Sequence, residues 1–267
     1  MSLSLGRIDP RYYQLTVQCG LLLCGWLTLE FVISWQTLLA VLLSGLLVQG
    51  LFLRYYELPM QWLSALNTCL SIILLLNAAA WWWLALAAMI AIASKFLLRV
   101  QGRHVFNPSN IGIVLVLLAT EQTWVAHGKW GQGLWLALLI AGLGLVAMLG
   151  WRRMLTSLVF LSTYAALLAG RAIWLGDPPD IPLHQLQNGA LLIFCFFMLS
   201  DPMTTPQSPK ARVLFGICVA LIGWSLQYFW FIPNAFLYAL ACCSPLVPLL
   251  NRRFAGARFH WLIRRES

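Results

Sequence analysis

The sequence predicts an all-α polytopic membrane protein, with about ten transmembrane helices in two inverted halves of five helices each. Of its 267 residues, 61% are hydrophobic and only 9% are charged, and the mean hydropathy is +0.81. A soluble core of this size does not need so much apolar surface. The apolar residues also form continuous runs of about 17–22 residues, the length of a membrane-spanning helix, rather than the alternation typical of barrel strands.

Ten apolar runs can be marked along the chain, with ends placed to within about two to four residues. Lipid offers no partner to backbone polar groups, so each run is expected to be helical. The fifth run is short and begins after Pro108, which indicates a broken or half-inserted helix. The runs lie at about 13–34, 36–53, 61–77, 81–98, 109–120, 133–150, 154–175, 184–199, 211–228 and 231–250.

The distribution of Lys and Arg predicts the orientation. With ten spans, only Lys129 and Arg171 fall on one side of the membrane, and the other fifteen of the 17 basic residues fall on the opposite side. Cytoplasmic loops carry the excess of Lys and Arg, so both termini are expected in the cytoplasm. The net charge of +9 is therefore a topology signal, and no nucleic-acid partner is expected. The fifteen are Arg7, Arg11, Arg54, Lys95, Arg99, Arg103, Arg152, Arg153, Lys210, Arg212, Arg252, Arg253, Arg258, Arg264 and Arg265.

We expect one transmembrane domain over residues 1–267, with halves at about 1–125 and 126–250. The remaining residues, 251–267, form a basic cytoplasmic tail suited to anionic lipid headgroups. Two sequential halves with an odd number of spans must have opposite orientations, which is the geometry of inverted repeats. The third run of each half opens on a similar polar pattern, around Asn67 and Asn188.

A polar stretch over residues 95–110 interrupts the apolar pattern and ends in an N-cap residue, Asn107, followed by Pro108. One interpretation is a helix start at the membrane surface with flanking cations. The functional interpretation is a site for a planar, electron-rich ligand. Free N–H groups at a helix start favour negative charge, Arg103 supplies a forked donor, and Asn107 and Asn110 supply amide groups. A reduced flavin, anionic at the pyrimidine end of its ring, is a ligand of this kind.

A second polar segment, residues 200–206, has similar chemistry near the other end of the chain. Asp201 begins a turn or helix, and Thr204 and Thr205 add hydroxyl groups. An acidic residue at the end of an apolar span indicates a functional site, although a helix cap or an ion pair with a neighbouring cation explains it equally well. We expect the two segments to face each other and to form one binding site.

Other chemistry is not expected from the sequence. Phosphate-loop, dinucleotide, nucleophile-elbow and metalloprotease motifs do not occur in it. The four histidines lie in predicted loops and in the tail, whereas haem ligands normally face inward from spans. No catalytic residue and no metal site are therefore predicted.

The two polar segments resemble a known family. Residues 102–108 (Gly-Arg-His-Val-Phe-Asn-Pro) are similar to the Gly-Arg-Asn-Phe-Leu-Asn-Pro-type segment of the NqrB/RnfD family, and residues 196–204 (Phe-Phe-Met-Leu-Ser-Asp-Pro-Met-Thr) are similar to its Phe-Phe-Met-Ala-Thr-Asp-Pro-Val-Thr/Ser signature. Order and spacing agree over about residues 60–250. These proteins are membrane subunits of the sodium-pumping NADH:quinone oxidoreductase and of the Rnf ferredoxin:NAD oxidoreductase.

The resemblance implies ten spans in two inverted halves, in a bacterial inner membrane, with one-electron transfer through flavins. It implies partner redox subunits, so the chain is expected to be a subunit of an oxidoreductase or translocase-type complex. It also places His104 and Asn107 near a non-covalent riboflavin toward the inner face. The family carries a covalent flavin mononucleotide on a threonine in an outer loop, but the loop here, residues 121–131, lacks that motif. A non-covalent flavin, riboflavin or flavin mononucleotide, is expected, and a covalent one is not.

Three hypotheses remain open. The first is an electron-transfer subunit that binds a flavin through Arg103, His104, Asn107 and Asn110 on one segment and through Asp201, Thr204 and Thr205 on the other. The second is a transporter or channel-like protein on the same inverted-repeat scaffold, in which the two segments bind a small molecule or ion. The third is an assembly subunit that has lost its cofactor chemistry.

Overall fold

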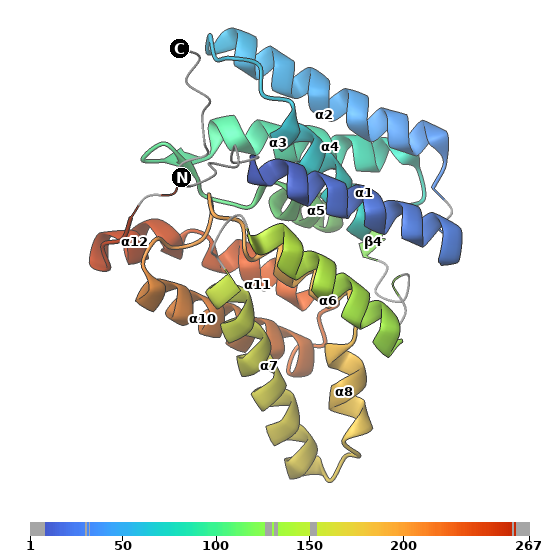
Figure 1. The fold of residues 1–267 in the computed structure, drawn as a ribbon, viewed down its shortest axis with the longest axis vertical. Coiled ribbons are helices and arrows are strands. Elements are labelled where there is room, and N and C mark those ends of the chain that lie inside the picture. Colours follow the sequence, from blue (N-terminus) through green and yellow to red (C-terminus); the bar gives the residue numbers. More distant parts are fainter. Residues whose placement is uncertain are drawn as a thin grey trace, which may run out of the picture.

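A computed structural model of the chain describes residues 9–29, 31, 33–125, 130, 133–149, 154–257 and 259. Within these residues the chain is a bundle of helices with two very short antiparallel sheets. Much of the basic tail expected over residues 251–267 lies outside the described residues. Figure 1 shows the helices of the first half, in blue and green, above those of the second half, in yellow and red.

The first half contains five helices, and the order of packing follows their lengths. Two long outer helices flank a short, buried third helix, because that helix is apolar all round and needs neighbours on every side. Helix α2 packs against α4, α4 packs against α5, and α1 packs against α3. The helices are α1 (Pro10–Thr28), α2 (Trp35–Tyr55), α3 (Leu63–Leu75), α4 (Trp81–Leu97) and α5 (Pro108–Ala119).

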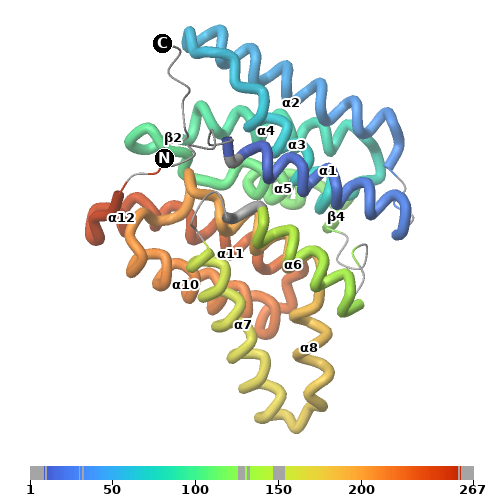
Figure 2. Tube along the Cα trace, viewed as in Figure 1, coloured from blue at the N-terminus to red at the C-terminus, as the bar shows by residue number. Residues whose placement is uncertain are grey.

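The second half repeats this packing with interrupted helices. Helix α7 packs against α10, α10 packs against α11, and α6 packs against α9. The two halves meet where α1 lies beside α6, as Figures 1 and 2 both show. The helices are α6 (Leu134–Leu149), α7 (Met154–Leu175), α8 (Asp180–Leu186), α9 (Gly189–Ile193), the π-helix η2 (Phe194–Met198), α10 (Pro209–Tyr228), α11 (Ala235–Cys243) and α12 (Leu246–Arg253).

Two short sheets mark the two ends of the bundle. Strand β2 (Arg99–Val100) pairs with β3 (Arg103–His104), and β1 (Leu76–Ala78) pairs with β4 (Thr123–Val125). The start of α1, strand β2 and α12 lie at one end of the molecule, and β4 lies at the opposite end (Figures 1 and 2). We call the end that carries β2 and α12 the β2 end, and the other the β4 end.

The apolar helices identify a membrane protein. Among the described residues, three helices are long and apolar enough to cross a membrane, α2, α7 and α10. Two bent pairs raise this to five if each pair forms one span: α8 with α9 and η2, bent by 47°, and α11 with α12, bent by 49°. Helices α3, α4, α5 and α6 are apolar but shorter. Large apolar side chains such as Leu43, Leu47 and Leu51 lie exposed along α2, which suits contact with lipid.

All ten predicted apolar runs contain helix, but their lengths differ from the expected ones. The run at 61–77 ends early, because residues 76–78 leave the helix and pair with β4. The runs at 184–199 and 231–250 are each divided between helices that bend relative to one another. The short fifth helix begins at Pro108, as predicted.

The centre of the bundle consists of α3 and the α9–η2 segment. All residues of α9 and η2 are buried, as are most residues of α3. Close approach of neighbouring helices depends on small residues: a Cβ atom added at Gly112 of α5 would lie 2.5 Å from the Ala87 carbonyl oxygen and 2.8 Å from the Ala91 Cβ of α4. Such small-residue contacts favour helix association where lipid removes the hydrophobic driving force.

Candidate functional site

The first polar segment is a tight hairpin between α4 and α5. Its two turn residues, Gln101 and Gly102, have φ angles of 53° and 77°. Positive φ at both central positions is characteristic of two-residue hairpin turns, and glycine adopts it without steric cost. The turn places Arg103 and His104 side by side on β3, where both side chains are partly buried.

The guanidinium group of Arg103 connects this hairpin to the second polar segment. Its Nη2 donates to the carbonyl oxygens of Pro202 at 2.7 Å and Thr205 at 2.9 Å, and its Nε donates to that of Met203 at 3.0 Å. With the Gln207 amide oriented so that both its groups are paired, Nη1 donates to the Gln207 oxygen at 2.9 Å. Arg103 thus satisfies the carbonyl groups of a turn that lies almost one hundred residues away.

Asn107 both caps α5 and contacts the second segment. Its Oδ1 accepts hydrogen bonds from the Asn110 backbone N–H at 3.1 Å and from the Ser109 hydroxyl at 2.8 Å. Its Nδ2 donates to the Met198 carbonyl at 3.3 Å and to Asp201 Oδ2 at 3.2 Å. The Met198 carbonyl ends the π-helix η2, and π-helical turns are frequent at functional sites. The two polar segments therefore lie in direct contact.

Asp201 lies in the turn that follows η2, and its carboxyl group is surrounded by donors. Besides Asn107, the Met203 N–H donates to Asp201 Oδ1 at 2.9 Å. Burial raises the pKa of Asp201 above its ordinary value, because the charged form loses its hydration; the Met203 hydrogen bond and the positive charges of Arg103 and Lys95 oppose this shift. This carboxyl group takes up a proton more readily than a solvated aspartate does.

His104 is held in one neutral form. Its Nδ1 lies 3.0 Å from the Lys95 carbonyl oxygen, which can only accept, so Nδ1 carries the proton and Nε2 is left as an acceptor. Burial lowers the pKa of His104 to about 3, and the positive charges of Lys95, Arg99 and Arg103 add to this shift.

Lys95 contributes a buried positive charge that the sequence motifs did not assign to the site. Its side chain is 4% exposed, and its Nζ donates to the Ser64 carbonyl at 2.9 Å and to the Ser64 hydroxyl at 3.1 Å. In the described part of the chain the ion pairs are Asp9 with Arg11 and Arg171 with Asp177, so Lys95 has no carboxylate within 4 Å. The available signal was a lysine in the last turn of an apolar helix, but the same pattern is also typical of a topology charge.

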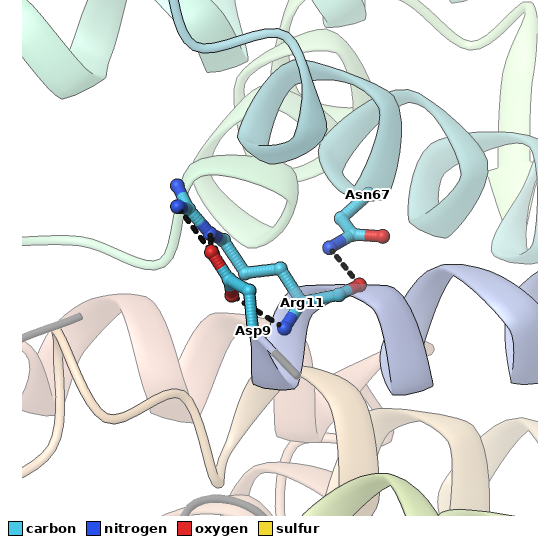
Figure 3. Close-up of polar contacts among 3 residues, drawn as sticks. All are labelled: Asp9, Arg11 and Asn67. Atoms are coloured by element: carbon cyan, nitrogen blue, oxygen red, sulfur yellow. Dashed lines mark hydrogen bonds and ion pairs between the residues drawn. The ribbon is translucent and has the colours of Figure 1, made fainter. Parts of the chain in front are cut away.

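These groups surround a polar cavity of about 70 Å³, which we call the β2-end cavity. It lies between the starts of α1, α3 and α5, the end of α4 and the turn after η2. One wall is shown in Figure 3, where Asn67 of α3 donates to the Arg11 carbonyl at 3.2 Å while the Asp9 carboxylate accepts from the Arg11 guanidinium. Asn67 Oδ1 is buried and has no partner. The lining residues are Arg11, Gln14, Ser64, Asn67, Thr68, Ser71, Lys95, His104, Asn107, Pro108, Ser109, Phe197, Asp201 and Met203.

Three residues predicted for the site do not line this cavity. Asn110 is fully buried and donates instead to the Leu237 carbonyl of α11 at 3.1 Å. The hydroxyl groups of Thr204 and Thr205 point back to the Asp201 carbonyl, at 3.5 and 2.8 Å. These residues hold the backbone around the cavity in place. The loop expected to lack the covalent flavin motif, at 121–131, lies partly outside the described residues, at 126–129 and 131.

The fold and the cavity define a class: a polytopic α-helical membrane protein whose interrupted central helices meet at a buried polar site. A family model described as "NQR2, RnfD, RnfE family" matches residues 118–260, which is more than half of the chain. The chain belongs to this family. The matched region includes the second polar segment, whereas the first, at 102–108, lies outside it.

Three relatives agree with this family membership, and each is named as the RnfD-type component of an ion-translocating oxidoreductase complex. The chain is 30% identical over 131 residues to the relative from Sodalis glossinidius, covering 48% of this chain and 36% of the relative. It is 28% identical over 161 residues to the relative from Aeromonas hydrophila, covering 55% and 44%. For Escherichia coli the figures are 28% over 138 residues, 51% and 36%. The matched region thus spans less than half the length of these relatives.

The low pKa of His104 predicts how stability depends on pH. Between pH 6.5 and 3 the unfolded chain binds a proton at this residue and the folded chain does not, so the His104 contribution is fully present above about pH 6.5 and is lost as the pH falls. The loss is about 1.4 kcal/mol per pH unit. His104→Gln removes the titrating group, so unfolding in detergent from pH 8 to 4 should show the variant gaining on the wild type below pH 6.5. A constant difference across this range contradicts the assignment.

Proposed function

We propose that the chain is an electron-transfer subunit that works with partner redox subunits in a bacterial membrane. Family membership supports this, because the relatives described above are named as components of an ion-translocating oxidoreductase complex. The observation that carries the proposal is the contact between the two polar segments through Arg103 and through Asn107 with Asp201. A buried polar junction is costly in an apolar bundle and is retained at functional sites.

The proposed ligand of the β2-end cavity is a non-covalent flavin, riboflavin or flavin mononucleotide. The chemistry of the lining suits the polar edge of the ring: Lys95 supplies a positive charge for an anionic reduced ring, His104 Nε2 and Asn67 Oδ1 can accept from ring N–H groups, and Asn107 presents an amide. A flavin supplies one-electron transfer when bound. Arg103, Thr204 and Thr205 support the site by fixing the 201–205 turn, and Asn110 by fixing α5 to α11.

The size of the cavity sets a condition on this proposal. Pockets for ring-sized ligands usually measure about 300–1,000 Å³, and the β2-end cavity measures about 70 Å³. In this closed form the cavity admits only the polar edge of a flavin ring. The 200–206 segment must therefore move outward when a flavin binds, and the hydrogen bonds between the Arg103 guanidinium and the carbonyl groups of this segment are the contacts that such a movement breaks.

We also propose that the two halves form an inverted repeat with both termini in the cytoplasm. The pairings of α2 with α4, α4 with α5 and α1 with α3 recur as α7 with α10, α10 with α11 and α6 with α9. The basic residues of the β2 hairpin and of α12 support a cytoplasmic β2 end.

Cysteine labelling tests this orientation. Glu57, in the loop after α2, and Asp180, at the start of α8, are both exposed. We expect a membrane-impermeant maleimide added to intact cells to label Asp180→Cys and not Glu57→Cys, because their loops lie on opposite sides of the membrane. The unsubstituted chain gives the background from its seven native cysteines, all free. Labelling of both positions from outside, or of Glu57→Cys alone, contradicts the proposed topology.

A transporter or channel-like protein is the second candidate. The small, polar cavity with a buried Lys95 and Asp201 favours it, because a volume of about 70 Å³ suits a small solute or ion without rearrangement. Short central helices that end at a buried polar site are also characteristic of transporters built from inverted repeats.

Flavin content separates the two candidates. Protein purified in detergent should carry the visible absorbance of a flavin, and acid should release the flavin because no covalent bond holds it. Asn107→Leu and Asp201→Leu should each lower the flavin-to-protein ratio by about fivefold or more, since each removes a hydrogen-bonding group worth about 1 kcal/mol or more from the cavity.

The matched control is Asn77→Leu, which changes an amide at the opposite, β4 end of the bundle and should leave flavin content unchanged. Size-exclusion chromatography of each variant reports whether it still inserts and folds. A colourless wild-type preparation from cells that make flavin favours the transporter, and full occupancy in both cavity variants rules out the site.

A further inference from the structure

The largest cavity among the described residues lies at the other end of the bundle from the polar segments. It measures about 350 Å³, which is within the usual range for small-molecule sites. We call it the β4-end cavity, because Val125 of β4 and Leu75 at the end of α3 lie in its wall together with residues of α7, α9, α10 and α11. It shares no lining residue with the β2-end cavity.

The two cavities occupy corresponding places in the two halves. The β2-end cavity lies beside α3, at Asn67, and at the cap of α5, Asn107. The β4-end cavity lies beside α9, at Asn188, and at the residue before α11, Asn234. In both halves the loop before the short helix contains residues with positive φ angles, Gln101 and Gly102 in one and Phe231 and Asn234 in the other. An inverted repeat places two such cavities at opposite ends of a bundle.

The lining of the β4-end cavity differs in charge from that of its counterpart. The described residues in its wall include amides and a phenol but no charged side chain. The nearby cation Arg171 is already engaged, since it pairs with Asp177 at 3.2 Å and stacks over the Tyr228 ring at 4.5 Å. Burying a phosphate or carboxylate without a cation is costly, so the cavity suits an uncharged ligand.

Hydrogen bonds among the lining residues leave donors available. The Tyr164 hydroxyl donates toward Gln227 Oε1 at 3.1 Å and toward Gln185 Oε1 at 3.3 Å, sharing its proton between them, and the Tyr228 hydroxyl also donates to Gln185 Oε1. Both glutamine oxygens therefore already accept hydrogen bonds, which orients the amides. In the described part of the chain the Nε2 groups of Gln185 and Gln227 have no protein acceptor. Fixed N–H₂ groups in an apolar wall recognise carbonyl oxygens.

Aromatic rings form the rest of the wall. The rings of Tyr164 and Phe236 pack edge to face with centroids 4.8 Å apart, and Phe194 lies beside Phe236 at 6.1 Å. Near the cavity, Phe229, Trp230 and Phe231 at the end of α10 are 64–82% exposed, as is typical of residues at the membrane interface. A flat apolar ring that dissolves in the bilayer can reach the cavity past these side chains.

We propose that the β4-end cavity binds an uncharged planar ring with carbonyl acceptors, a cyclic dione, which enters from the membrane and accepts hydrogen bonds from Gln185 and Gln227. Ring faces pack against Tyr164, Phe194 and Phe236. The proposal goes beyond the flavin site at the β2 end and does not depend on it.

The test compares two ring compounds of the same shape. The full chain in detergent micelles is titrated calorimetrically with 2-methyl-1,4-naphthoquinone, a dione, and with 2-methylnaphthalene, which lacks the carbonyl groups; empty micelles give the partition blank. We expect saturable binding of the dione at one site per chain, and only partition for the hydrocarbon. Equal binding of both compounds overturns the proposal, because it shows that the carbonyl groups are not recognised.

Variants locate the site. Gln185→Leu and Gln227→Leu should each weaken dione binding by about three- to tenfold, the loss expected for one hydrogen bond. Because these changes also remove partners of Tyr164, Ile232→Trp serves as a second variant that fills the cavity and leaves the glutamine–tyrosine hydrogen bonds intact; it should abolish saturable binding. Wild-type affinity in Gln227→Leu and in Ile232→Trp overturns the assignment.

Two controls separate this site from the flavin site. Gln61→Leu changes an exposed glutamine at the loop before α3, outside both cavities, and should bind the dione as the wild type does. Asn107→Leu should lower flavin content and leave dione binding unchanged. Loss of dione binding in Asn107→Leu, with the fold intact, contradicts a separate site.

Discussion

The contact between the two polar segments is the constraint on which the rest of the structure depends. Each segment interrupts helical structure in an apolar protein, and helix ends leave backbone groups that lipid cannot satisfy. Arg103 and Asn107 of the first half supply donors to the carbonyl groups at Met198, Pro202 and the residues that follow in the second half. The two interruptions thus satisfy one another, and a small polar cavity forms where they meet.

Repetition of one plan in both halves gives the bundle two cavities of different character. At the β2 end, Lys95, His104 and Asp201 make the cavity polar and charged, and the hydrogen bonds across it keep it small. At the β4 end, Gln185 and Gln227 lie in an aromatic, uncharged wall around a larger space. The backbone arrangement is shared, and the side chains at the helix ends decide which ligand each end can hold.

The sequence predicted the features that depend on neighbouring residues. Asn107 caps the helix that Pro108 begins, helix occurs in every apolar run, and Asp201 lies against the first segment. It did not predict that Arg103 binds backbone carbonyl groups, or that Lys95 is buried against Ser64, because both depend on which residues the fold brings together from distant parts of the chain. The early end of α3 was missed for the same reason: its cause is the pairing of β1 with β4.

A double-mutant cycle between Asn107 and Asp201 tests the central claim most directly. The unfolding free energies of Asn107→Ala, Asp201→Ala and the double variant are measured in detergent at neutral pH. Side chains in direct contact usually couple by about 0.5–3 kcal/mol, whereas distant ones are additive within about 0.3–0.5 kcal/mol. The 3.2 Å hydrogen bond between Asn107 Nδ2 and Asp201 Oδ2 predicts a coupling in the first range. Strict additivity would show that the two polar segments do not meet.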